Sequence, residues 1–434
     1  MNTENFLKKK FDLNFELDHK KFIDDLHERL LDEFCIELNS LHNIKWSKRV
    51  WRIFIGPWLT RYITSILRLI IEYQELEKNN QINFVDKTKE PSQLVLTCND
   101  LIEFSNNIQS KEFVYKFFIR INSYFKNNEK KFNYLDYIKK KENKANKRDK
   151  LSYKFKINFF KFFQKILFKR NDIIIYKIYF GNFISTLKLF IKLRQFPFKY
   201  NLIEKIPKFE IDTSIRSKIN LKKSENLYKK ILKDFILEIM PTNYIEGFKL
   251  RLEDAENSFL PKKAKYIYSC SIYSDYRFKY WACGQINNGA KLIYGQHGAA
   301  YNAFIYDQRS EHEIKISDLY FSWGWTAELK KIIPCGVSSI TGKKLIKNNA
   351  QKNKILYLPG IILQRPYENI ISRFVDRHTD KKYQTYQLEK LDSFLKKMKK
   401  EDLKNFFVKP HPNEKINDFK ISDFLKIHNE IEFL

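Results

Sequence analysis

The residues best suited to chemistry lie between Lys291 and Trp325. An apolar run, Leu292 to Tyr294, stops abruptly at the segment Gly295-Gln296-His297-Gly298, and a second aromatic run, Tyr320 to Trp325, comes later. Between the two runs lies a carboxylate-bearing segment that contains Glu311, His312, Glu313 and Asp318. Because α/β proteins bind ligands at the carboxyl ends of their strands, this part of the chain is where we expect a site.

The proton-transfer candidates in this region are one imidazole and three carboxylates. The imidazole of His297, or the carboxylate of Glu311, Asp318 or, less favoured, Glu313, can take a proton from an attacking hydroxyl when burial or a neighbour tunes its pKa. An alternative is structural: Glu311, His312 and Glu313 would decorate a helix, and Asp318 would cap the turn into the next strand. The region lacks the HExxH spacing of a zinc site, so we expect no metal.

A second histidine-bearing loop, Lys409-Pro410-His411-Pro412, follows the apolar run Asn405 to Val408. The prolines fix the backbone, Lys409 supplies a positive charge, and His411 can donate a hydrogen bond to a phosphate oxygen. Two α/β domains that face each other, with a ligand between the two histidine loops, would accommodate this pair. The chain has no GxGxxG motif and no P-loop, which disfavours dehydrogenases and P-loop ATPases.

The elements that must position these loops alternate between strands and helices. Two strand–helix–strand units are visible, and such units build parallel sheets. The first unit comprises Lys265–Ser269, Asp275–Asn288 and Lys291–Tyr294, and the second comprises Lys354–Leu358, Thr385–Lys399 and Asn405–Val408. Further candidates are an apolar run at Asp172–Tyr176, a helix at Thr186–Leu193 and a short strand at Leu94–Cys98.

The first 75 or so residues have apolar positions at the three- and four-residue spacing of helices. Within them, Trp46 to Tyr62 (WSKRVWRIFIGPWLTRY) gathers three tryptophans and four basic residues around Gly56-Pro57. We interpret this segment as an aromatic core helix that is broken at the Gly-Pro pair, in preference to a direct ligand contact.

The net charge of +29 points to anionic partners, or else reflects a compositional bias toward lysine. The Lys139–Lys150 run is nearly all polar, which favours a solvated loop. Bulky aromatics alternate with lysines in Tyr153–Phe163; such a segment could lie on an anionic bilayer, and a core helix with a lysine-rich outer face explains it nearly as well.

No apolar run is long enough to span a membrane, and the Lys-rich start shows no secretory signal. The five cysteines form no CxxC pair and are expected to be reduced thiols. We therefore expect a cytoplasmic protein, with a peripheral position on the inner face of the cytoplasmic membrane as a further option.

Three segments resemble a family of bacterial surface-carbohydrate (O-antigen-type) biosynthesis transferases. They are SLHNIKWSKRVWRIFIGPWLTRY, the stretch from FKYWACGQINN through QHG to ISDLYFSWGW, and VKPHPNE. These proteins look like two-domain, GT-B-like glycosyltransferases, distantly similar to capsule Kdo transferases and bacterial sialyltransferases. The resemblance implies sugar transfer from a nucleotide sugar, with a CMP-activated ulosonic acid as one candidate, to a glycan or lipid-linked acceptor.

The resemblance also implies roles for the two histidine loops. Lys409, His411 and Pro412 would match the donor-binding loop, while Gln296, His297 and Gly298 would match the cleft loop of the first domain. The nucleotide sugar is a substrate, so no cofactor is expected. Ala299 stands where related chains commonly carry a second glycine. A left-handed backbone conformation is less favourable for alanine than for glycine.

The resemblance and the element pattern together predict an α/β protein with a pair of Rossmann-type domains. Residues 1–170 would be a mainly helical region with a basic aromatic insert, 171–345 an acceptor-side α/β domain, and 346–434 a partial donor domain. Since the chain stops soon after its second histidine loop, we expect a truncated second domain. Two alternatives remain open: a basic nucleic-acid-binding protein, although no nucleic-acid-reading motif is present, and an inactive fragment of the transferase family.

Overall fold

The computed structural model describes residues 13–79, 94–108, 110–125, 162, 172–178, 183–193, 195, 208–224, 226–258, 260–272, 276–298, 308–340, 354–357, 391–408 and 432–433. The chain divides into two compact units, Met1–Lys343 and Lys344–Leu434.

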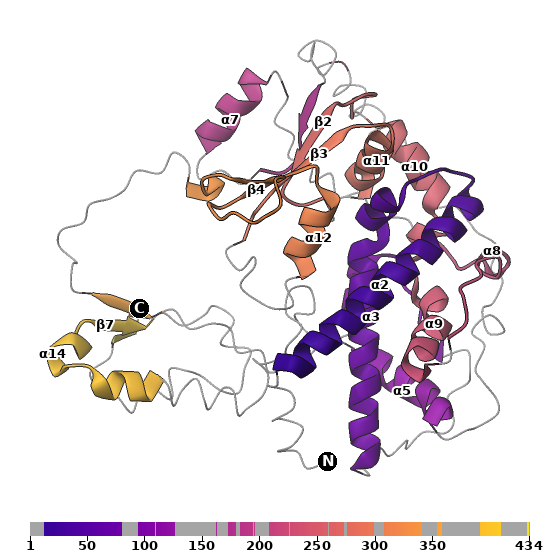
Figure 1. Ribbon diagram of the computed structural model, residues 1–434, viewed down its shortest axis with the longest axis horizontal. Helices are drawn as coiled ribbons and strands as arrows, with labels where there is room; N and C mark the ends of the chain where they lie inside the picture. The colour runs from indigo at the N-terminus through magenta and orange to yellow at the C-terminus, as the bar shows by residue number, and fades with distance from the viewer. Residues whose placement is uncertain are drawn as a thin grey trace. The chain divides into compact units, whose positions relative to one another are not determined.

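A long central helix, α3 (Lys48–Lys78), organises the helical part of the first unit (Figure 1). The helices that pack on it come from the whole length of the unit. They are α2 (Leu13–His42), α5 (Lys111–Phe125), α9 (Leu227–Ile239), α11 (Tyr276–Asn287) and α12 (Gln308–Ile316). The shorter elements are α4 (Leu101–Asn107), α7 (Phe183–Lys192), α8 (Thr213–Arg216), η3 (Thr242–Tyr244), α10 (Phe248–Glu256) and η4 (Ser338–Ile340). The N-terminal helices are thus packed directly against helices of the α/β part.

The predicted break at Gly56-Pro57 is wrong, because α3 runs through Pro57 without interruption. A proline inside a helix removes one backbone hydrogen bond and costs about 3 kcal/mol. Trp51 and Trp58, on either side of the pair, are fully buried, and each large aromatic side chain contributes a comparable burial energy. Core packing therefore outweighs the local breaker, and the interpretation of this segment as aromatic core is confirmed.

Five parallel strands form the sheet of the first unit, in the order β1-β2-β3-β4-β5. They are β1 (Ile173–Ile175), β2 (Tyr266–Ser269), β3 (Lys291–Gly295), β4 (Leu319–Ser322) and β5 (Ile332–Pro334). The predicted unit of strand, helix and strand is confirmed as β2-α11-β3. Strand order follows chain order without a reversal among these five, so the sheet supports the mixed α/β prediction but does not establish a doubly wound Rossmann domain.

The strand predicted at Leu94–Cys98 is absent. The segment is instead held by single hydrogen bonds: the Leu96 amide donates to Glu238 Oε1 at 2.5 Å, and the Thr242 amide donates to the Cys98 carbonyl at 3.0 Å. Leu96 and Cys98 are buried, so the apolar run marks burial and not sheet pairing.

The second unit contains a parallel sheet in the order β6-β7-β8. The strands are β6 (Ile355–Tyr357), β7 (Phe406–Val408) and β8 (Glu432–Phe433), and residues 391–397 and α14 (Lys400–Leu403) are helical. The predicted strand at each end of the second strand–helix–strand unit is confirmed, as is the helix over 391–397. Phe394 and Tyr357 both pack on Phe406, which joins the helix to the sheet.

Candidate functional site

The loop at the carboxyl end of β3 is fixed by Gln296, whose amide side chain is buried. Its Oε1 accepts hydrogen bonds from the Trp323 amide at 2.8 Å and from Trp325 Nε1 at 2.7 Å. Its Nε2 donates to the Gly298 carbonyl at 2.7 Å. Gln296 therefore ties the ends of β3 and β4 together and shapes the loop, and its oxygen is already occupied by protein donors. This arrangement favours a positioning role for Gln296 over direct contact with a ligand.

His297 follows in the same loop and faces a carboxylate on α12. Its Nδ1 lies 3.9 Å from Glu313 Oε1; the Glu313 side chain is fully buried, whereas 19% of the His297 side chain remains exposed. A carboxylate beside an imidazole can orient the ring and stabilise an imidazolium that forms during a reaction. The pair therefore has the chemistry of a base with a supporting carboxylate.

The sequence favoured a structural place for Glu313 on its helix, although it contains a signal for a role of Glu313 in the site. The buried positions of α12 and the residue after it are Ser310, Glu313, Ile316 and Ser317, at helical spacing of three and four. An acidic residue on the buried face of a helix needs a partner, because burying a lone charge is costly. Among the described residues, the imidazole of His297 is such a partner.

Two basic side chains hold the carboxyl end of α12. Arg49 Nε donates to the Ile316 carbonyl at 2.8 Å, and Lys331 Nζ donates to the Ser317 carbonyl at 3.2 Å. Positive charge at a helix C-terminus is favourable, because the unpaired carbonyls there carry a partial negative charge. These contacts fix the helix that presents Glu313 to His297.

Asp318, a predicted general base, lies at the opposite end of the strands. Its carboxylate accepts hydrogen bonds from Arg49 Nη2 at 2.5 Å and from the Leu292 amide at 2.8 Å, at the start of β3. Four residues of strand separate Leu292 from Gln296, or about 13 Å. Burial raises the pKa of Asp318, but the hydrogen bonds from Arg49 and the Leu292 amide outweigh it, and the net pKa lies below its usual value. The structure does not bring Asp318 to His297, and its contacts favour a structural role.

Glu311, the third predicted base, faces a different part of the unit. It lies two residues before Glu313, which turns it about 200° around the helix and onto the other side of α12. There Lys20 Nζ lies 3.0 Å from Glu311. Burial raises the pKa of Glu311, against the lowering effect of the Lys20 hydrogen bond and charge.

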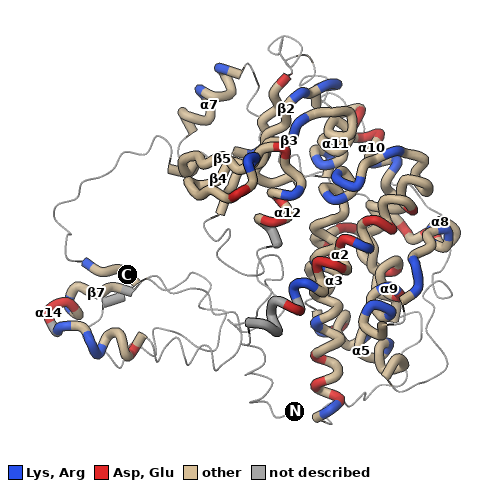
Figure 2. Tube along the Cα trace, in the orientation of Figure 1, with Lys and Arg blue, Asp and Glu red and all other residues tan. Residues whose placement is uncertain are grey.

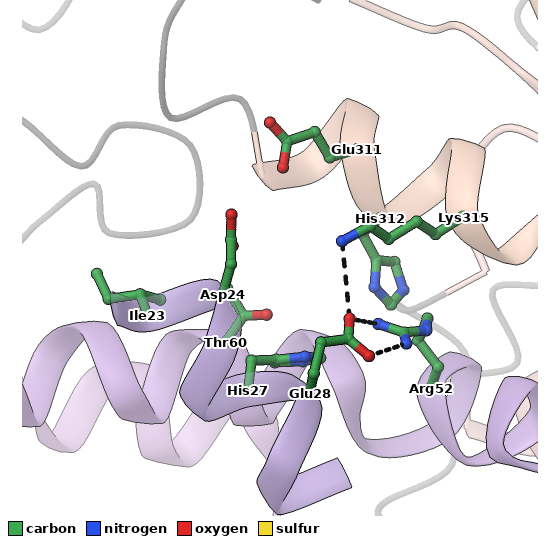
Figure 3. A pocket seen from close by; sticks show the side chains of 9 residues that line it. All are labelled: Ile23, Asp24, His27, Glu28, Arg52, Thr60, Glu311, His312 and Lys315. Carbon is green, nitrogen blue, oxygen red and sulfur yellow. Dashed lines mark hydrogen bonds and ion pairs between the residues drawn. The ribbon is translucent and has the colours of Figure 1, made fainter. Parts of the chain in front are cut away.

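Glu311 lines a small pocket between α2, α3 and α12 that is partly open to solvent (Figure 3). Its lining residues are Ile23, Asp24, His27, Glu28, Arg52, Thr60, Glu311, His312 and Lys315. Arg52 pairs with both oxygens of Glu28 at 2.7 and 2.6 Å, and Lys315 approaches the same carboxylate at 3.7 Å. The hydrogen bond from Arg52 is the main cause that lowers the pKa of Glu28 to about 2.

Both histidines of the pocket are held uncharged. Burial, and then the Arg52 charge, lowers the pKa of His27 to about 4, and burial together with the His27 and Arg52 charges lowers the pKa of His312 well below its usual value. His312 packs on Gly56 so closely that a Cβ on that glycine would lie 2.8 Å from His312 Cε1. The pocket is therefore a tightly packed joint, with paired charges and neutral imidazoles, that fixes α12 against α2 and α3.

The predicted donor-binding residues, Lys409, His411 and Pro412, lie outside the described residues, as do residues 299–307 after the first histidine loop. Of the predicted site residues in the first unit, Gln296, His297 and Gly298 share one loop, while Glu311 and Asp318 are held elsewhere. Within the described part of the chain, no group of three or more His, Cys, Asp or Glu side chains is placed to hold a metal ion.

No curated protein and no solved structure matches the chain. A model of a transferase family, described as the LIC12162 family, matches residues 4–431. Because this match spans nearly the whole sequence, the chain belongs to the LIC12162 family of transferases and is an enzyme.

Proposed function

We propose that this transferase is a glycosyltransferase that moves a sugar from a nucleotide-activated donor to a hydroxyl of a surface glycan or lipid-linked acceptor. A CMP-activated ulosonic acid is the candidate donor. The observation that carries the proposal is the His297–Glu313 pair, which places a carboxylate-backed imidazole at the carboxyl end of a parallel strand. The transferase family of the chain and the resemblance of its motifs to surface-carbohydrate enzymes support the same reading.

The proposed chemistry assigns the base to His297. Its Nδ1 faces Glu313, and the ring is assigned as the acceptor of the hydroxyl proton. As the imidazole takes the hydroxyl proton, the acceptor oxygen forms a bond to the anomeric carbon of the donor, and the bond from that carbon to the phosphate oxygen breaks. The nucleotide leaves with the bonding electron pair, and Glu313 stabilises the imidazolium. The 3.9 Å separation is longer than a hydrogen bond, and such contacts commonly shorten when substrate binds.

The donor side of the proposal rests on the chemistry of Lys409 and His411. A lysine and a histidine flanked by prolines supply positive charge and hydrogen-bond donors on a stiff backbone, which suits a nucleotide phosphate. His411→Ala is expected to weaken binding of a cytidine nucleotide, measured by calorimetry on the full chain, without changing the melting temperature. Unchanged nucleotide affinity would remove this residue from the donor site.

The base assignment is tested with three variants of the full chain, assayed for release of nucleotide from candidate sugar donors. His297→Ala is expected to lower kcat by roughly 10²- to 10⁴-fold, the usual contribution of a general base. Glu313→Gln keeps the shape but removes the negative charge, so it should lower kcat with little change in KM. Glu253→Gln, at an exposed position on α10, is the matched control and should stay near the wild-type rate. A full rate in His297→Ala, or an equal loss in Glu253→Gln, would contradict the assignment.

A further inference from the structure

Helix α7 presents large apolar side chains to solvent. The exposed fractions are 71% for Phe183, 62% for Ile184 and 65% for Ile191. With 100° of turn per residue, these three positions and Leu187 fall within an arc of about 100° on one side of the helix. Contiguous exposed apolar side chains of this size mark contact surfaces more often than scattered ones do.

The end of α7 is fixed to the sheet. Phe190, about 20° around the helix from Phe183, is buried, and Gln195, just after the helix, is bonded to the edge strand β1. Its Oε1 accepts from the Ile175 amide at 3.0 Å, and its Nε2 donates to the Ile175 carbonyl at 2.9 Å. The side chain thus continues the hydrogen bonding of the open sheet edge. These contacts hold the carboxyl end of α7 at the edge of the sheet, while the arc stays exposed.

The charges on α7 itself are all of one sign. Lys188 and Lys192 are exposed and lie about 40° and 80° past the Ile184 edge of the arc, and α7 contains no acidic residue (Figure 2). In Figure 1, α7 stands at the margin of the first unit, apart from the helices packed on α3. A short helix with an apolar side and flanking lysines fits the surface of a bilayer, where rings and aliphatic chains enter the acyl boundary and ammonium groups meet lipid phosphates.

We propose that α7 is a docking helix that lies in the plane of an anionic lipid surface. Charge complementarity selects this partner, because the chain carries a net charge of +29 and the arc is bordered by lysines. No helix in the described part of the first unit or the second is long and apolar enough to cross a membrane, so contact through α7 would be peripheral. Docking is independent of which group the enzyme transfers, and it would bring the enzyme to a lipid-linked acceptor.

The test is sedimentation of the full chain with vesicles of neutral phosphatidylcholine, with or without anionic phosphatidylglycerol. The wild type is expected to bind the anionic vesicles, and more weakly as salt increases. Ile184→Glu combined with Ile191→Glu should abolish binding, because the carboxylates oppose both insertion and lipid charge. Ile36→Glu, at a position on α2 that is 70% exposed, is the matched control and should bind like the wild type.

A second variant separates charge from insertion. Replacing Lys188 and Lys192 with Gln should weaken binding to anionic vesicles by roughly fivefold for each lysine lost, with little effect on neutral vesicles. Unchanged binding of the double glutamate variant would overturn the proposal. So would a wild type that ignores anionic vesicles but forms a dimer that the glutamates dissociate, since the arc would then contact a second copy. Nucleotide release from a sugar donor in solution is unaffected by these variants if docking and catalysis are separate.

Discussion

Lys279 offers a sharp test of the energetics of the first unit, because its ammonium is buried and has no carboxylate partner among the residues that the structure describes. The side chain is only 2% exposed, and Nζ donates to the Phe54 carbonyl at 3.2 Å and to Tyr244 Oη at 3.3 Å. It also lies 4.6 Å from the ring centre of Phe54, 4.8 Å from that of Tyr244 and 4.9 Å from that of Tyr276. Burial nevertheless dominates and lowers the pKa of Lys279 to about 8.

The lowered pKa makes stability depend on pH in a definite direction. The unfolded chain binds a proton at Lys279 up to about pH 10.5, whereas the folded chain releases it near pH 8. Between these values the unfolded state holds more protons, so folding stability rises with pH. The whole shift of about 2.5 pKa units corresponds to about 3.4 kcal/mol, and linkage assigns about 2.4 kcal/mol of it to the interval from pH 7.5 to pH 10.

Lys279→Met removes the titrating group and keeps a flexible, unbranched side chain of similar length. We expect the free energy of unfolding of the wild type to rise, relative to that of this variant, by about 2.4 kcal/mol from pH 7.5 to pH 10. All six tryptophans precede residue 344, so tryptophan fluorescence during urea unfolding reports on the first unit. Lys249→Met, at an exposed position, should retain the wild-type pH dependence. Parallel curves for wild type and Lys279→Met would refute the reasoning.

Two further predictions concern the joint between α3 and α12. Gly56→Ala should destabilise the first unit by about 1–3 kcal/mol in urea unfolding, because its Cβ would meet His312 Cε1 at 2.8 Å. Gly284→Ala on α11 has open space and should instead stabilise by about 0.5–1 kcal/mol, the usual gain of alanine over glycine in a helix; the same sign for both would show that the close approach is unimportant. Because the folded pKa of His27 is about 4, its protonation favours unfolding, and stability should fall as pH drops from 6.5 toward 4. His27→Gln should flatten that fall in melting temperatures taken across the interval, and an unchanged slope would contradict the assignment.

The helices and strands that could be predicted from the sequence are those whose patterns lie within a few neighbouring residues. Apolar runs ended by polar groups marked β2, β3, β6 and β7, and helical spacing marked α7 and α11, because each signal spans only a few neighbouring residues. The Gly56-Pro57 break failed for the opposite reason. Local propensity favours a break there, and only the burial of tryptophans by distant segments keeps the helix intact.

The site residues depend even more on contacts that sequence spacing cannot reveal. Asp318 was predicted as a candidate base because its partner could not be seen in the sequence. That partner, Arg49, lies 269 residues away on α3. Glu313 was interpreted as a structural residue on the surface of a helix. Its neighbours in the sequence do not show that its side of α12 faces the loop of His297. A carboxylate in sequence is ambiguous until the fold shows which cation or imidazole faces it.

The two sides of α12 make the joint and the proposed base interdependent. Glu313 faces His297 on one side, while Glu311 and Lys315 make ion pairs with α2 on the other, and these pairs fix the rotation of the helix. A rotation of α12 by about 20° would move a side-chain tip some 6 Å from the axis by about 2 Å, enough to separate Glu313 from the imidazole. The network around Glu28 and Arg52 therefore contributes to the geometry of the base without touching it, which explains why so many charges are concentrated on the side of α12 that faces away from the sheet.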